Sequence, residues 1–173
     1  MKNLLVIPIL LLMVSCAPIR VSYDFERTAD FSKYKSYNYY SNIDSGLSEL
    51  DTKRLLDALD AGLQAKGFTL SETPDFFIDI KSSEYQENQN STVGVGMGGT
   101  GRNVGGGISI GIPIGQANMN RQIQFDFVDE HGKGLFWQAV SESSMSANTS
   151  PEKRESTFKA IVTKVLENFP PKK

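Results

Sequence analysis

Three segments of this chain alternate apolar and polar residues, which is the pattern of a β-strand that buries one face. They are residues 19–26, 74–81 and 121–128, and residues 135–143 are a further expected strand. A fifth segment, Ser36–Tyr40, is rich in tyrosine, which favours extended backbone. Residues 129–134 have the composition of a turn, so we expect the last two segments to form a hairpin. The sequence therefore predicts a mostly antiparallel sheet of about five or six strands.

Two other segments have apolar residues at helical spacing. The first follows Ser48 and has Asp51 three residues later, close to a capping box, so we expect a helix over about residues 49–66. The second follows Ser150-Pro151, an N-cap with proline at the first helical position, and ends at Pro170-Pro171. Two amphipathic helices packed on the sheet make an α+β fold.

The N-terminal segment has the pattern of a lipoprotein signal peptide. Lys2 supplies a positive charge, and the apolar run Leu4–Val14 is too short to span a bilayer as a mature helix. The run ends in Met13-Val14-Ser15-Cys16, which resembles the bacterial lipoprotein box, where the cysteine is acylated after cleavage. We therefore expect residues 1–15 to be a signal peptide and Cys16, the single cysteine, to carry the membrane anchor.

The mature chain, residues 16–173, has the length of one domain. Its first strand segment begins at Ile19, so the fold starts roughly 10 Å from the lipid. Ala17 is not the aspartate that resembles an inner-membrane retention signal in enterobacterial lipoproteins. By that resemblance, we expect the protein at the periplasmic face of the outer membrane.

Charge and histidine content argue against several kinds of site. The chain has 18 Lys+Arg and 20 Asp+Glu, a formal net charge of −2, so neither a nucleic-acid partner nor a basic patch for anionic lipids is expected. The single histidine, His131, lies in a turn, which leaves no base for a Ser-His-acid site. One histidine and an acylated cysteine cannot form a zinc site.

Asp75 and Asp79 are the remaining carboxylate pair. They are four residues apart on one strand face, so their Cα atoms lie about 13 Å apart, farther than glycoside chemistry usually needs. We therefore expect a non-catalytic protein without metal or cofactor. A periplasmic hydrolase that depends on carboxylates alone is the alternative.

Residues 93–115 hold ten of the chain's 15 glycines and contain two matches to G-x-G-x-x-G. A dinucleotide site needs a helix directly after that motif, and the glycines that follow exclude one, so no nucleotide is expected. Aliphatic residues instead alternate with small ones on both arms, which predicts an extended insertion with one apolar face. These residues are Val93, Val95, Met97, Ile108, Ile110, Ile112 and Ile114.

The Gly-rich insertion has several candidate uses, and the sequence leaves them open. An extended segment with one apolar face can lie on a membrane, pair with another envelope protein or a second copy, or cover a groove of its own domain. It can also be a connection without a dedicated partner.

The order of the motifs resembles one family of bacterial lipoproteins. The motifs are the opening strand, residues 30–39, the helix ending in Lys66-Gly67-Phe68, residues 74–78, residues 134–139 and the closing helix. Together they resemble the family known as domain of unknown function 4136. This sequence differs in having Asn38-Tyr39 where, in that family, a tryptophan often follows the Lys-x-Tyr pattern. The family has no established activity, so the resemblance implies an envelope lipoprotein of unknown role. Separately, we expect a binding or structural module that works through protein or lipid contacts.

Overall fold

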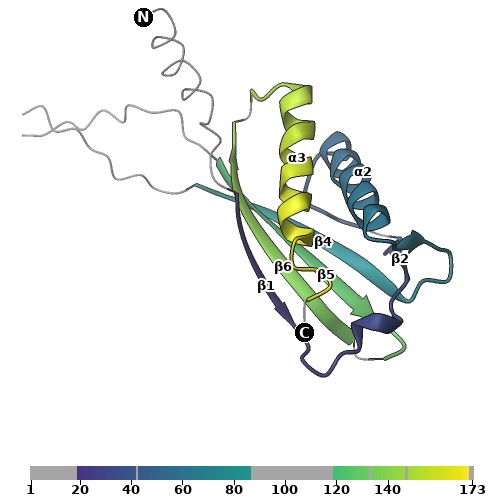
Figure 1. Ribbon diagram of the computed structural model, residues 1–173. Coiled ribbons are helices and arrows are strands. Elements are labelled where there is room, and N and C mark those ends of the chain that lie inside the picture. Colours follow the sequence, from purple (N-terminus) through teal and green to yellow (C-terminus); the bar gives the residue numbers. More distant parts are fainter. Residues whose placement is uncertain (1–18, 42, 87–118, 133, 147, 172–173) are drawn as a thin grey trace, which may run out of the picture.

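Six strands form one mixed sheet, and two helices cover one of its faces (Figure 1). The computed structural model describes residues 19–41, 43–86, 119–132, 134–146 and 148–171. The strands are β1 (Arg20–Phe25), β2 (Ser36–Tyr39), β3 (Thr69–Leu70), β4 (Phe76–Gln86), β5 (Met119–Asp129) and β6 (Gly134–Met145). The helices are η2 (Phe31–Lys33), α2 (Glu49–Ala65) and α3 (Pro151–Leu166). The predicted α+β fold is confirmed.

The strand order is β1-β6-β5-β4-β2-β3. The pairs β1–β6, β4–β5 and β5–β6 are antiparallel, and β5 and β6 form the hairpin that the sequence predicts. β2 pairs in parallel with both β3 and β4. This parallel pairing follows from α2, because the chain must cross the sheet as a helix before β4 can run beside β2.

Both helices begin as the sequence predicts. The Ser48 hydroxyl accepts from the backbone N–H of Asp51, and the Ser150 hydroxyl accepts from that of Lys153, so each serine is an N-cap. The helices lie against each other at Gly62, where an added Cβ would lie 2.7 Å from Leu166 Cδ1. No helix in the described ranges is long and apolar enough to span a membrane.

The core lies between the helices and the sheet, and Phe169 lies at its centre. The Phe169 ring, just beyond α3, contacts five other aromatic rings at centroid distances of 4.7 to 6.2 Å. These rings belong to Phe31, Phe68, Phe76, Phe127 and Trp137. This cluster fixes the end of α3 against the strands, while the N-terminal turns of both helices lie over the opposite end of the sheet (Figure 1).

Candidate functional site: an arginine-lined cleft

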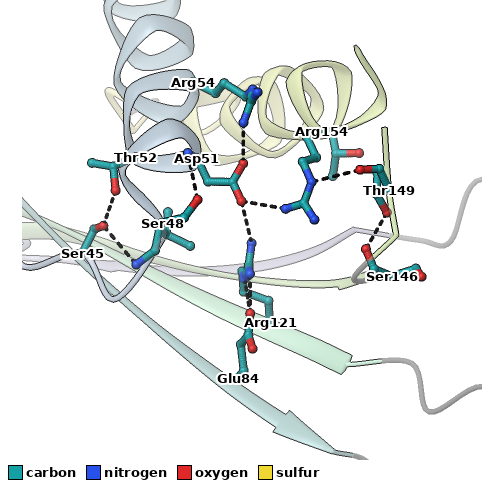
Figure 2. A network of polar contacts seen from close by, with 12 residues as sticks. Ser45, Ser48, Asp51, Thr52, Arg54, Glu84, Arg121, Ser146, Thr149 and Arg154 are labelled. Carbon is teal, nitrogen blue, oxygen red and sulfur yellow. Dashed lines mark hydrogen bonds and ion pairs between the residues drawn. The ribbon is translucent and has the colours of Figure 1, made fainter. Parts of the chain in front are cut away.

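An open cleft of about 550 Å³ lies where the first turns of α2 and α3 meet the strands β4 and β5. Three arginines from three elements line it: Arg54 of α2, Arg121 of β5 and Arg154 of α3. Its other lining residues are Gly46, Ser48, Leu50, Asp51, Glu84 and Pro151. Figure 2 shows the three guanidinium groups directed toward one carboxylate, that of Asp51.

Asp51 is the centre of the charge network. Its side chain is only 3% exposed, and it lies in the first turn of α2, where the helix dipole favours a negative charge. Arg54 Nη1 donates to Asp51 Oδ1 at 2.8 Å, and Arg154 Nη1 donates to Asp51 Oδ2 at 2.7 Å. One carboxylate therefore joins α2 to α3. In a capping box, the side chain at this position would instead accept a hydrogen bond from the backbone N–H of the N-cap residue, Ser48.

Arg121 connects the sheet to the same network. Its Nε donates to Glu84 Oε1 at 3.1 Å across the β4–β5 pair, and its Nη2 donates to the same oxygen. Its Nη1 lies 3.9 Å from Asp51 Oδ2, too far for a hydrogen bond. This buried Nη1 has no hydrogen-bond partner among the residues that the structure describes.

The loop before α2 holds the floor of the cleft in place. Gly46 has a φ of 67°, and a Cβ there would lie 2.7 Å from the carbonyl oxygen of Ser82 in β4. The Ser45 carbonyl accepts from the N–H of Ser82 at 2.8 Å, and the Ser45 and Thr52 hydroxyls are 2.7 Å apart. The start of α2 is thus tied to β4 beside Glu84 (Figure 2).

The residues that the sequence predicts to carry the lipid and to contact a partner lie outside the described ranges. These are Cys16 and the aliphatic residues of the 93–115 segment. His131 is described, exposed and placed in the β5–β6 turn, where its backbone N–H donates to Asp129 Oδ1 at 3.0 Å. Within the described ranges, no group of three or more His, Cys, Asp or Glu residues could hold a metal ion.

Asp75 joins β2 to the start of β4. Its Oδ2 accepts from the backbone N–H groups of Lys35 and Ser36, both at 2.8 Å, and from the Ser36 hydroxyl at 2.9 Å. Desolvation raises the pKa of Asp75, but these hydrogen bonds outweigh it and bring the pKa below its ordinary value.

Asp79 faces a different carboxylate from the one that the sequence paired with it. Its Oδ2 accepts from Lys81 Nζ at 2.7 Å, on the sheet face that the helices leave open. Asp126 of β5 lies directly opposite Asp79 in the register. Strand alternation within one segment could not identify this cross-strand neighbour, because the pairing of β4 with β5 depends on the whole sheet.

The arginines of the cleft were not singled out from the sequence. They are separated by 67 residues between Arg54 and Arg121 and by 33 between Arg121 and Arg154, and none belongs to a recognisable motif. The signal that could have pointed to them is Ser48-x-x-Asp51 opening an amphipathic helix, because the carboxylate of Asp51 attracts basic side chains. The net charge of −2 conceals this local cluster.

The fold and the cleft define a small α+β module with a charged, solvent-open site at its helix N-termini. The chain belongs to the family described as domain of unknown function (DUF4136), whose model matches residues 21–171. No curated protein matches the chain in sequence.

Three solved structures have similar folds. A PDZ domain protein from Parabacteroides distasonis is 15% identical with a TM-score of 0.57, and the match covers 91% of this chain and 36% of that one. The PelC dodecamer from Paraburkholderia phytofirmans is 10% identical with a TM-score of 0.53, over 90% of this chain and 100% of that one. A DUF4136 family protein from Bacteroides thetaiotaomicron is 13% identical with a TM-score of 0.52, over 88% and 96%. At these identities the likeness is one of fold alone.

Proposed function

We propose that this protein is a cell-envelope lipoprotein, anchored through Cys16 at the periplasmic face of the outer membrane, which works as a non-catalytic binding module. The observation that carries the proposal is the position of the arginine-lined cleft relative to the start of the fold. Arg20, the first residue of β1, pairs with Glu142 of β6, which in turn pairs with Gln122 of β5. Gln122 directly follows Arg121 in the chain. Two strand spacings, about 10 Å, therefore separate the chain's entry into the sheet from the cleft wall.

This arrangement supports a module that binds close to its anchor. Only three residues separate Cys16 from Arg20, so an acylated Cys16 would hold this end of the sheet near the membrane surface. The cleft would then open within reach of lipids and of other membrane-anchored proteins.

The anchor is tested by replacing its cysteine. The full chain and Cys16→Ser would be produced in a Gram-negative envelope with labelled palmitate, followed by membrane fractionation. We expect label on the wild-type chain, recovery with the outer membrane, and loss of the label in Cys16→Ser. An unlabelled wild-type chain, or label that persists without Cys16, would contradict the proposal.

The partner in this proposal is another envelope protein or a second copy, contacted through residues 93–115. Of the similar folds, PelC is a dodecamer, which shows that this fold can be part of a multi-subunit protein. Cross-linking in the native envelope would compare the full chain with one lacking residues 93–115. We expect a discrete cross-linked species that the deletion removes, and an unchanged pattern would contradict this assignment.

A carboxylate-dependent hydrolase is kept as a second candidate because Asp79 and Asp126 face each other. Directly opposite residues have Cβ atoms about 4.5–5.5 Å apart, which allows a carboxyl separation of the kind used by retaining glycosidases. Gln138 Nε2 donates to Asp126 Oδ1 at 2.7 Å, so the pair has fixed neighbours. Turnover of envelope glycans that disappears in both Asp79→Asn and Asp126→Asn would favour the hydrolase over the binding module.

A further inference from the structure

The arginine-lined cleft has more positive than negative groups on its walls. Arg54, Arg121 and Arg154 face Asp51 and Glu84, so the lining side chains carry one positive charge in excess. Two further acids, Glu152 and Glu155 of α3, interact electrostatically with Arg54, but both are fully exposed and engaged elsewhere. Glu152 accepts from its own backbone N–H and from Ser150 at the helix start, and Glu155 accepts from Lys159 at 2.7 Å.

Two of the three arginines, Arg54 and Arg121, also retain hydrogen-bond donors. A guanidinium group has five N–H donors. Arg54, whose side chain is 22% exposed, uses one nitrogen, Nη1, for its bond to Asp51 within the described part of the chain. Arg121 has its Nη1 in the cleft wall without a hydrogen-bond partner there. An anion in the cleft would supply the acceptors that the two carboxylates do not.

The backbone adds to this preference for an anion. Both helices begin at the cleft, since Ser48 and Pro151 line it and Arg154 reaches from one first turn to the other. The N-terminal ends of helices carry partial positive charge, which favours negatively charged ligands. Two helix ends and three guanidinium groups therefore surround one solvent-open space.

We propose that this cleft binds the phosphate group of a phosphorylated ligand. Guanidinium forks match the paired oxygens of a phosphate and hold them with charge-assisted hydrogen bonds. A volume of about 550 Å³ exceeds what one phosphate occupies, and Leu50, 65% exposed, lies on the rim. The ligand therefore carries an uncharged portion beside its phosphate, as a phosphorylated small molecule or a lipid headgroup does. This site depends on the described side chains and does not require that Cys16 be acylated.

The experiment measures phosphate binding by the full chain in a neutral detergent. Thermal unfolding would be followed while inorganic phosphate is titrated against chloride at matched ionic strength. A second arm adds phosphatidylglycerol or uncharged diacylglycerol to the micelles. The test variant is Arg54→Gln, and the matched control is Arg27→Gln, which removes an exposed arginine from the turn after β1. Arg54→Lys keeps the charge and removes the fork.

We expect phosphate, but not chloride, to raise the unfolding temperature to a plateau, with an apparent Kd about tenfold weaker in Arg54→Gln. Arg27→Gln should match the wild type, and Arg54→Lys should fall between. A response to inorganic phosphate without one to phosphatidylglycerol identifies a soluble ligand, and the reverse identifies a lipid headgroup. The proposal is overturned if neither arm saturates, or if Arg27→Gln weakens binding as much as Arg54→Gln. Neither result depends on palmitate labelling. Failure of the phosphate-binding proposal can therefore be distinguished from failure of the proposed lipid anchor.

Discussion

At the scale of single residues, Asp51 connects two helices through charge. Its buried carboxylate accepts from Arg54 on its own helix and from Arg154 on α3. Removing one member of such a network leaves the other charges without compensation in a partly buried place. Asp51 therefore makes a central contribution to the contact between the two helix starts.

Replacing Asp51 with asparagine should lower the free energy of unfolding by about 2 kcal/mol, because the charge is lost while the shape is kept. Urea unfolding at neutral pH measures this difference. Asp44→Asn, an exposed aspartate in the loop before α2, is the control and should change stability by less than about 0.5 kcal/mol. An equal effect of the two substitutions would show that Asp51 has no special role.

The side-chain partners were the part of the structure that the sequence predicted least. Ser48 and Ser150 were identified as N-caps because a cap depends on neighbours within four residues. The convergence of Arg54, Arg121 and Arg154 depends on how two helices cross one sheet, which no local pattern encodes. Asp126 was missed as the neighbour of Asp79 for the same reason.

At the scale of elements, Asp75 joins two parallel strands that are not consecutive in the chain. Its carboxylate accepts three hydrogen bonds from Lys35 and Ser36, just where β2 begins. β2 is only four residues long, and this clamp adds three hydrogen bonds where it begins.

The clamp should be lost in acid. The folded pKa of Asp75 is lowered below 3.8, so the folded state binds fewer protons than the unfolded chain, and the stabilisation is complete above about pH 5. It declines as the pH falls through 3.8 toward the lowered pKa. We expect Asp75→Ala to cost about 1 kcal/mol at pH 7 and much less at pH 3. Urea midpoints at both pH values measure this, and a cost independent of pH would contradict it.

Element boundaries were predicted well where the signal is local. The first helix was expected over about residues 49–66 and is Glu49–Ala65. β4 was expected to end near Lys81 but continues to Gln86, because β5 pairs with it along its whole length. The parallel pairing of β2 was not predicted, since tyrosine content indicates a strand without indicating its direction or neighbours.

At the scale of the whole molecule, the packing protects phenol groups from ionisation. Four of the six tyrosines have a raised pKa, and the largest cause in each is desolvation, followed by hydrogen bonds to carboxylates. The pKa rises to about 12 for Tyr34 and for Tyr40, and Tyr37 and Tyr39 are raised further.

This predicts an alkaline limit to folding. Between about pH 10 and pH 12 the folded state holds more protons than the unfolded chain, so stability falls as the pH rises. We expect the urea midpoint to decrease steadily above pH 10, and to decrease less steeply in Tyr39→Phe. A midpoint that is constant from pH 9 to pH 11.5 would show that these phenols titrate as they do in the unfolded chain.

The strand ends on either side of residues 87–118 have a consequence for how this chain can change. Gln86 and Met119 are register partners, so the pairing of β4 with β5 closes the connection at a fixed point whatever its length. In general, the entropy cost of closing a loop grows only with the logarithm of its length, so a loop of twice the length costs about 0.6 kcal/mol more. Insertions, deletions or a reporter peptide placed between these two residues should therefore leave the rest of the domain folded.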